Sequence, residues 1–254
     1  MNYPPVRQFD GMLLCSRYAF MPNKLEYCGG RHNEDLFERG INNSADPFLF
    51  SLLKEFQTLY PYLKLIAESN NISDVFDFRV VEAYWIGNEL LEKTNMRKFY
   101  WHFIDNLNLK KKLRQDEFEK LIGKIPSGAI PHHSFHVFNV WLRTGNLPIA
   151  HTIETMNACR ISWGKIIGIN GNEMEVETQN LIEKENKISL SDSITKKIIY
   201  KFFDRGFIEN PKINDFVSIH WNFACDILTT QQVKNLEKFT QYSMNLANRQ
   251  SLTK

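Results

Sequence analysis

Residues 159–178 contain the clearest structural signal in this chain and read CRISWGKIIGINGNEMEVET. Apolar and polar residues alternate on both sides of the Asn-Gly-Asn sequence at 170–172, and this period of two is typical of a half-buried strand. An Asn-Gly pair supplies the positive φ angles of a tight turn between antiparallel strands. The stretch therefore predicts a β-hairpin formed by residues 165–169 and 173–178.

Further short strands are predicted after the hairpin. Residues 187–190 and 216–220 alternate in the same way. Several short strands without long helices between them indicate a small antiparallel β-barrel of the OB-like kind. Residues 229–248 then have a polar amphipathic pattern that predicts a C-terminal helix. We expect residues 158–254 to form this barrel domain with its helix.

The first part of the chain has a helical pattern instead. Asp46 and Pro47 are typical of a helix start, and apolar residues recur after them at steps of three and four. Similar stripes occupy residues 79–93 and 99–107. These patterns predict an irregular α-helical domain over residues 1–157, so the whole chain is expected to have an α+β fold.

The composition excludes several classes of protein. Among 254 residues, 31 Lys and Arg oppose 29 Asp and Glu, which leaves a net charge of +2, too small for the positive field that non-specific nucleic-acid binding requires. No stretch reaches the roughly 18 apolar residues of a membrane-spanning helix, and the N-terminus lacks the apolar core of a signal peptide. We therefore expect a cytoplasmic protein with no nucleic-acid and no membrane partner, whose four cysteines are thiols.

A thiol and an imidazole mark the two ends of the predicted barrel. Cys159 stands just ahead of the first strand, and His220 stands 61 residues later at the end of the last one. Closure of a barrel brings such ends together at its rim, where a thiolate and an imidazole are suitable ligands for a borderline metal such as Fe(II). Cys225 follows five residues after His220 and either faces the same rim or belongs to the core.

At these positions the sequence resembles the small hydrogenase assembly chaperones of the HypC/HupF type. In those proteins a cysteine is separated by four residues from a glycine that opens a strand, a turn and a second strand follow, and a later Gly-Asp-Tyr-Val-x-Val-His segment leads into a C-terminal helix. Here Cys159 is separated by four residues from Gly164, and residues 214–220 (NDFVSIH) match the later segment. The resemblance covers about 95 residues. The whole chain looks like an uncharacterised bacterial family that joins a helical region to such a barrel.

The resemblance implies a function in the maturation of nickel-iron hydrogenases. In that family the cysteine follows the initiator Met and helps to hold an iron unit with CN and CO ligands, which the chaperone passes between a scaffold protein and the hydrogenase large subunit. For this chain it implies an accessory protein without catalytic turnover, which binds iron through Cys159 and His220 and whose partner is a maturation scaffold or a metalloenzyme subunit. Arg160, Trp163 and Trp221 flank these ligands and are expected at the partner interface.

The helical part contains a second candidate metal site. His132 and His136 are four residues apart, so they share one face of either a helix or a strand, with His133 pointing elsewhere. Glu82 is the carboxylate expected to complete such a site, unless an arginine neutralises it, Arg17 or Arg79.

Two alternatives to the accessory role therefore stay open. One is a metal-dependent enzyme whose site is built from these two histidines and Glu82. The other is a protein interaction module without bound metal.

Overall fold

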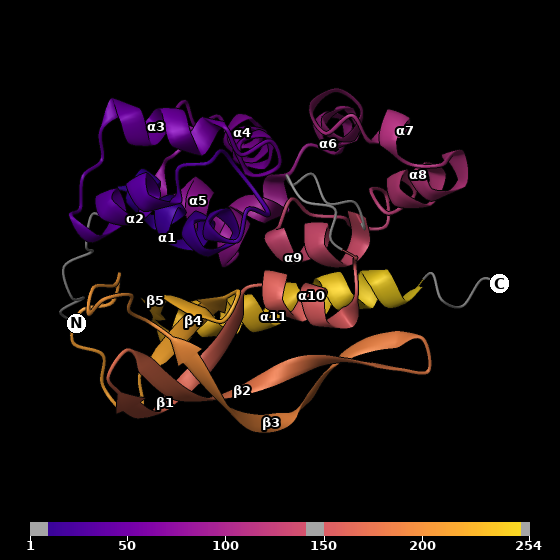
Figure 1. Cartoon of the computed structure of the whole chain (residues 1–254). Coiled ribbons are helices and arrows are strands. Elements are labelled where there is room, and N and C mark those ends of the chain that lie inside the picture. The colour runs from indigo at the N-terminus through magenta and orange to yellow at the C-terminus, as the bar shows by residue number, and fades with distance from the viewer. Residues whose placement is uncertain (1–9, 141–149, 250–254) are drawn as a thin grey trace, which may run out of the picture.

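The chain has the expected α+β fold in a computed structural model that describes residues 10–140 and 150–249 (Figure 1). Helices dominate as far as Cys159, five strands follow, and a long helix comes last. The helical elements before the sheet are α1 (Gly11–Lys24), α2 (Asn33–Ile41), α3 (Pro47–Lys54), α4 (Leu59–Ser69), α5 (Phe78–Trp85), η1 (Glu89–Lys93), α6 (Met96–Trp101), η2 (His102–Asn106), α7 (Leu109–Lys112), α8 (Gln115–Ile122), α9 (His133–Phe135), η3 (His136–Val140) and α10 (Ile153–Cys159). The elements after them are β1 (Ser162–Asn170), β2 (Glu173–Lys184), β3 (Lys187–Ile199), β4 (Phe216–His220), β5 (Phe223–Leu228) and α11 (Thr230–Asn248).

Two helices begin where the sequence predicts a start. Asp46 is the N-cap of α3, and its carboxylate accepts a hydrogen bond from the backbone N–H of Leu49 at 2.7 Å. Thr229 caps α11 in the same way and forms a capping box with Gln232. Both caps satisfy backbone donors that the first turn of a helix leaves without an intrahelical partner. Among the described residues, none of the helices combines the length and the apolar character that a membrane crossing requires.

The strands form a ring in the hydrogen-bonded order β1-β2-β3-β5-β4, and β4 pairs back with β1. The predicted β1–β2 hairpin is present, and its turn contains Gly171 at φ +57°. The longest pairing joins β2 and β3, which extend together as an arm beneath α10 and α11 (Figure 1). Strand β3 is much longer than the predicted strand at 187–190.

One seam of the ring departs from the predicted all-antiparallel barrel. Strands β3 and β5 run in parallel and share a single bridge, between Ile199 and Phe223. The cause is the connection through residues 200–215, which carries the chain across to place β4 beside β1, so that β5 returns next to β3 in the same direction. The sheet is therefore mixed, and the expectation of purely antiparallel pairing was wrong at this seam.

The helical part and the sheet share apolar contacts. The largest core cluster contains residues of α1, α4 and α5 together with Ile161, Cys225 and Leu236 from the second half. Figure 1 shows α11 between the sheet and the upper helices. The division into domains at residues 157 and 158 stays a prediction, but the two parts bury apolar surface against each other.

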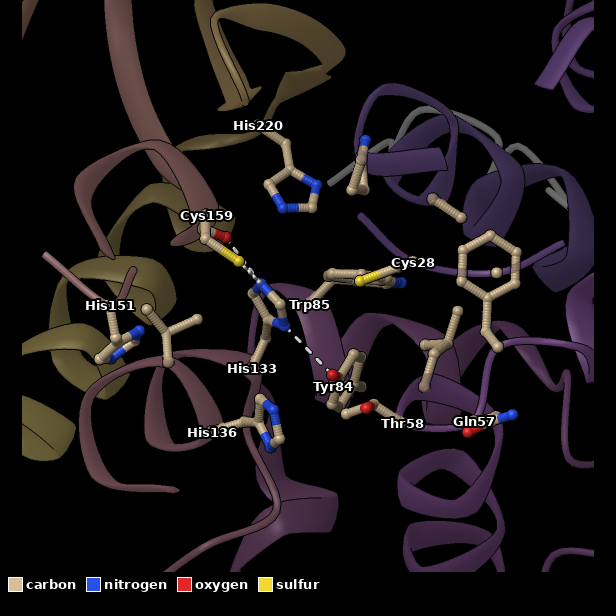
Figure 2. Close-up of a pocket in the computed structure, with 16 residues that line it drawn as sticks. Cys28, Gln57, Thr58, Tyr84, Trp85, His133, His136, His151, Cys159 and His220 are labelled. Atoms are coloured by element: carbon tan, nitrogen blue, oxygen red, sulfur yellow. Dashed lines mark hydrogen bonds between the residues drawn. The ribbon is translucent and has the colours of Figure 1, made fainter. Parts of the chain in front are cut away.

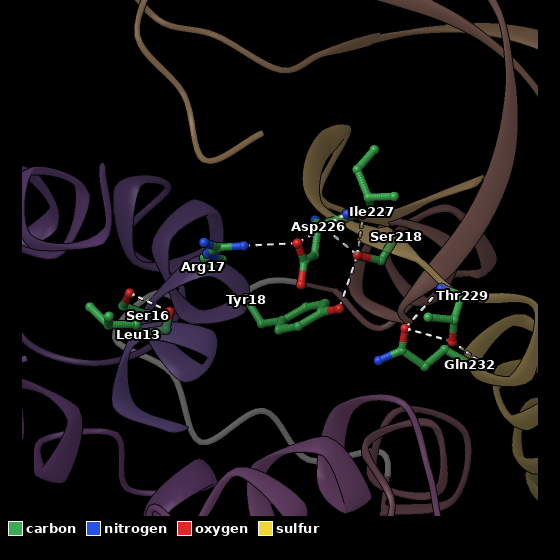
Figure 3. Close-up of polar contacts among 9 residues, drawn as sticks. All are labelled: Leu13, Ser16, Arg17, Tyr18, Ser218, Asp226, Ile227, Thr229 and Gln232. Carbon is green, nitrogen blue, oxygen red and sulfur yellow. Dashed lines mark hydrogen bonds and ion pairs between the residues drawn. The ribbon is translucent and has the colours of Figure 1, made fainter. Parts of the chain in front are cut away.

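Polar contacts also join α1 to the sheet (Figure 3). The Arg17 guanidinium lies 2.8 Å from the Asp226 carboxylate of β5, and both side chains are largely buried. The Tyr18 hydroxyl lies 3.0 Å from the hydroxyl of Ser218 in β4. These contacts fix α1 against the strands that end beside the site described next.

Candidate metal centre

A cavity of about 60 Å³ lies between the helical part and the end of the sheet (Figure 2). Ala19, Phe56 and Trp85 contribute to its apolar walls. Four of the seven histidines of the chain and two of its four cysteines line it, namely Cys28, His133, His136, His151, Cys159 and His220. Such a concentration of possible ligands in a mostly apolar enclosure is typical of a binding site.

Three of these side chains converge. His133 is the first residue of α9, Cys159 is the last residue of α10 and His220 is the last residue of β4. Their ligand atoms all lie within 4.8 Å of one another. We call this group the His133–Cys159–His220 cluster. The expected proximity of Cys159 and His220 is present, and the helical part adds a third possible ligand.

The backbone of α1 orients His220. Its Nδ1 lies 2.7 Å from the carbonyl oxygen of Tyr18, and because a carbonyl oxygen only accepts, Nδ1 is the donor. The neutral ring then has its lone pair on Nε2. Metal-binding histidines commonly donate their other ring N–H to a carbonyl in this way. His220, which is 1% exposed, is therefore held in the form that a metal ligand needs.

His133 has a partner at each ring nitrogen. Its Nε2 donates to the carbonyl oxygen of Cys159 at 2.7 Å, and its Nδ1 lies 3.1 Å from the hydroxyl oxygen of Tyr84. In the neutral ring Nδ1 accepts a hydrogen bond from that hydroxyl. The Cys159 sulfur lies 4.0 Å from Nε2. Figure 2 shows the His133 ring between Cys159 and Tyr84.

Trp85 packs against both imidazoles. Its ring centroid lies 4.6 Å from that of His133 and 5.6 Å from that of His220. Tyr18 stacks on Trp85 at 5.4 Å. Burial raises the pKa of both Tyr18 and Tyr84 well above the ordinary value, so both phenols stay protonated. The cluster thus lies against a wall of packed rings that limits the access of water.

The donor set suits a borderline transition metal. One thiolate and two imidazoles are ligands that Zn(II), Fe(II) and similar ions accept. Cys159 ends α10, and the partial negative charge at the C-terminus of a helix favours a cation and disfavours a bare thiolate. A cation beside Cys159 would therefore be compatible with this end of α10. Three protein ligands leave at least one coordination position open.

The structure does not bring His132 into this cluster. His132 is the N-cap of α9, and its extended backbone lets Nδ1 accept a hydrogen bond from the backbone N–H of Ser134 at 3.2 Å. Its ring stacks on Phe239, and burial lowers its pKa to about 3. An N-cap residue does not have helical dihedral angles, so the spacing from His132 to His136 does not place the two rings on one face.

His136 lines the cavity but lies outside the cluster. Its Nδ1 lies 3.3 Å from the hydroxyl oxygen of Tyr62. A tyrosine thus orients His136 much as Tyr84 orients His133.

Glu82 does not join the histidines either. Its carboxylate accepts hydrogen bonds from the side-chain amides of Asn88, at 3.0 Å, and Gln232, at 2.9 Å. It therefore links α5 to α11. The alternative, that Arg17 or Arg79 neutralises Glu82, is not seen either, because Arg17 binds Asp226 and Arg79 binds Asp77.

Cys225 belongs to the core. It is fully buried, its sulfur lies 3.6 Å from the carbonyl oxygen of Phe223, and burial raises the pKa of its thiol. It lies on β5, whereas His220 ends β4, and a bulge shifts the register between these strands. The core interpretation of Cys225 therefore fits the structure.

The three residues expected at a partner interface differ in exposure. Arg160 is 1% exposed, and its guanidinium donates to the Asn157 side chain at 3.2 Å and to the Gln179 carbonyl oxygen at 2.5 Å. Burial lowers its pKa to about 10. Trp163 and Trp221 are half-buried. Arg160 thus stabilises the start of the sheet from the inside, whereas the two tryptophans are partly accessible.

Sequence reasoning missed His133. The only sequence signal for His133 as a ligand was its position after His132. His132 is the N-cap of α9, so the side chain of His133, the first residue of the helix, points in a different direction. Recognising the ligand also requires the docking of α9 against β4, which no local pattern shows.

One family model matches the chain over the whole site. Residues 7–254 match a family described as a family of unknown function, DUF6390. No curated protein and no solved structure matches the chain. The matched region includes the helical part, the sheet and all three residues of the cluster. The chain therefore belongs to the DUF6390 family.

Proposed function

We propose that this protein is a metal-binding accessory protein that holds an iron ion at His133, Cys159 and His220 and passes it to a partner. The observation that carries the proposal is the convergence of the three ligand atoms within 4.8 Å. The hydrogen bond from His220 to the Tyr18 carbonyl supports it, because it leaves Nε2 as the ligand atom.

The choice of iron and of the partner rests on the resemblance. In that resemblance, Cys159 and His220 are matched by spacing and order with the signature cysteine and histidine of the HypC/HupF type chaperones, and they are two of the three clustered residues. We therefore propose a role in hydrogenase-type metallocentre assembly, with a maturation scaffold or a metalloenzyme subunit as the partner. None of the cysteines Cys15, Cys28, Cys159 and Cys225 forms a disulfide, which suits the reducing cytoplasm that we propose as the location.

Transfer rather than turnover suits this site. Cys159 is half-buried, while His133 and His220 are buried, so the sulfur is the ligand that an incoming group reaches first. A partner that offers its own thiolate would displace the metal by ligand exchange. The cavity of about 60 Å³ leaves room beside the cluster for small ligands.

The test is metal binding by the full chain under anaerobic conditions. Wild-type protein reconstituted with Fe(II) is expected to retain one equivalent after desalting. Cys159→Ala is expected to lose it, and Cys225→Ala, which removes a buried thiol outside the cluster, is the matched control and is expected to retain it. Equal iron retention by Cys159→Ala and wild type would refute the site.

The same preparation separates the alternatives. A protein interaction module predicts no retained iron in any variant. An enzyme site in the helical part predicts iron that is lost in a His132→Ala/His136→Ala double variant and kept without Cys159. For the proposed role, an anaerobic pull-down with a hydrogenase maturation scaffold is expected to recover a complex that depends on Cys159.

A further inference from the structure

The two histidines of the cluster differ in what their Nδ1 partner allows. The partner of His220 is the Tyr18 carbonyl oxygen at 2.7 Å, which can only accept. The neutral His220 ring is thereby restricted to one tautomer, with its proton on Nδ1. That tautomer is ready to bind a metal through Nε2.

His133 holds the opposite tautomer in this structure. Its Nε2 donates to the Cys159 carbonyl oxygen at 2.7 Å, so the proton of the neutral ring occupies the atom that belongs to the cluster. Nε2 cannot donate this proton and bind a metal at the same time. For His133 to become a ligand without changing its charge, the proton has to leave Nε2 and another has to bind Nδ1.

Tyr84 is the group that faces Nδ1. Its hydroxyl oxygen lies 3.1 Å from Nδ1, and a hydroxyl both donates and accepts. A carbonyl at this place would exclude the tautomer seen here, and an ammonium group would exclude the metal-binding one. A hydroxyl can donate to Nδ1 in one tautomer and accept from Nδ1–H in the other, and only its hydrogen has to rotate about the C–O bond.

We propose that Tyr84 is a positioning residue that lets His133 change tautomer on metal binding, its hydroxyl donating to Nδ1 in the metal-free protein and accepting from Nδ1–H in the metal-bound protein. The inference rests on the proposed metal-binding function and adds a residue and a proton rearrangement to it. The balance is simple. The Cys159 thiol releases one proton to solvent, and the His133 ring loses one proton at Nε2 and gains one at Nδ1, so it stays neutral.

The packing around Tyr84 suits this role. Its side chain is 1% exposed, and its ring contacts Trp85 at a centroid distance of 4.7 Å and His133 at 5.4 Å. Tyr62 packs on its other side at 5.4 Å. The ring is therefore fixed and only the hydroxyl hydrogen is free to turn. Because the phenol stays protonated, it keeps both its donor and its acceptor function.

Tyr84→Phe removes the hydroxyl and keeps the ring. Without it, Nδ1–H of metal-bound His133 has no acceptor at that position, and groups that orient a metal ligand typically change affinity by about 10–100-fold. We expect a loss of Zn(II) affinity in this range. The matched control is Tyr62→Phe, which removes the hydroxyl from the neighbouring pair of Tyr62 and His136 outside the cluster and is expected to bind Zn(II) as wild type does.

The tautomer itself is measurable. In protein labelled with ¹⁵N-histidine, long-range ¹H–¹⁵N spectra distinguish Nδ1–H from Nε2–H. Wild type is expected to show His133 protonated on Nε2 without metal and on Nδ1 with Zn(II), whereas His220 stays protonated on Nδ1 in both. Circular dichroism and thermal unfolding establish that the phenylalanine variants are folded, and the wild-type spectra test the tautomers without any variant.

The outcomes separate this inference from the proposed function. If wild type binds neither Zn(II) nor Fe(II), the proposed function fails and the inference fails with it. If wild type binds Zn(II) but His133 keeps its proton on Nε2, or Tyr84→Phe binds as tightly as Tyr62→Phe, the role of Tyr84 is refuted and the metal site stands. A tautomer change in wild type, together with a loss of affinity confined to Tyr84→Phe, supports it.

Discussion

Strand β4 and helix α9 bring histidines to the same cavity on very different supports. His220 ends a strand that is paired on both sides, with β1 and β5, and a backbone carbonyl fixes its ring. His133 opens a helix of one turn that continues into the π-helix η3, and a hydroxyl orients its ring. The sheet therefore supplies a possible ligand whose neutral ring has one permitted tautomer, and the helical part supplies a possible ligand whose Nδ1 partner is compatible with two.

This difference predicts different contributions of His220 and His133 to metal affinity and metal release. A pre-oriented ligand binds without rearrangement, and this raises affinity. A ligand that first gives up a hydrogen bond binds more weakly and is released more easily. A site that combines both is suited to holding a metal and then giving it away. The following predictions test the contrast, in order of decreasing expected effect.

The largest effect is expected from His220→Ala. Removal of the pre-oriented ligand is expected to weaken Zn(II) binding by more than about 100-fold, beyond the range typical of groups that only orient a ligand. His133→Ala is expected to weaken it less, because the lost metal contact is partly offset by the hydrogen bond that His133 no longer has to give up. Competition with a chromophoric chelator measures both affinities. A greater loss for His133→Ala than for His220→Ala would contradict the contrast.

A smaller effect, on stability, is expected from Arg17→Met. The Arg17 and Asp226 side chains are 7% and 19% exposed, and breaking a buried ion pair by removing one partner typically costs about 3 kcal/mol. The free energy of unfolding from urea titration, measured by far-UV circular dichroism, is expected to fall by about this amount. A change below about 1 kcal/mol would show that the Arg17–Asp226 pair contributes little to the attachment of α1 to β5.

Stability is expected to depend on pH through a histidine outside the cluster, His102. Burial lowers its pKa from 6.5 to about 3, so between these values the unfolded chain binds a proton that the folded protein does not. Stability is therefore lost as the pH falls from about 6.5 towards 3, by at most about 1.4 kcal/mol per pH unit for one group. His102→Gln is expected to flatten this part of the curve of unfolding free energy against pH. An unchanged slope in that variant would assign the acid sensitivity to other groups.

The smallest effect is expected from Arg205→Met. Arg205 and Glu38 join the loop before β4 to α2, and both side chains are about half exposed. The hydrogen bond from Arg205 lowers the pKa of Glu38, so the pair stabilises the folded protein above the ordinary pKa of Glu and loses this contribution as the pH falls through the lowered value. Because exposed pairs contribute little, we expect no resolved change in the urea midpoint at neutral pH. A loss as large as that of Arg17→Met would contradict this assignment.

Local patterns were enough to predict several elements. The Asn-Gly turn predicted the β1–β2 hairpin, Asp46 predicted the start of α3, and the amphipathic pattern of residues 229–248 predicted α11. Each of these features depends on residues within a few positions of one another. The β3–β5 seam was not predicted, because it depends on how residues 200–215 cross the end of the sheet.

The same distinction applies to the candidate site. Cys159 and His220 could be paired from their positions at the two ends of the predicted barrel. His133 could not, because its place in the cluster depends on the packing of α9 against Trp85 and β4. The prediction of a metal site at His132 and His136 required both residues to lie within one regular element. His132 is instead the N-cap of α9, so this condition is not met.

The arm formed by β2 and β3 reaches the far end of α11, where Asn248 forms two reciprocal hydrogen bonds with the backbone of Ile188. The Ile188 N–H donates to the side-chain oxygen of Asn248 at 2.9 Å, and the side-chain amide of Asn248 donates to the Ile188 carbonyl oxygen at 2.8 Å. One asparagine thus imitates an additional rung of a β-ladder at the tip of the arm. A chain truncated before Asn248 would lose both hydrogen bonds. We expect this one truncation to expose the tip of the β2–β3 hairpin and the end of α11 to proteases together.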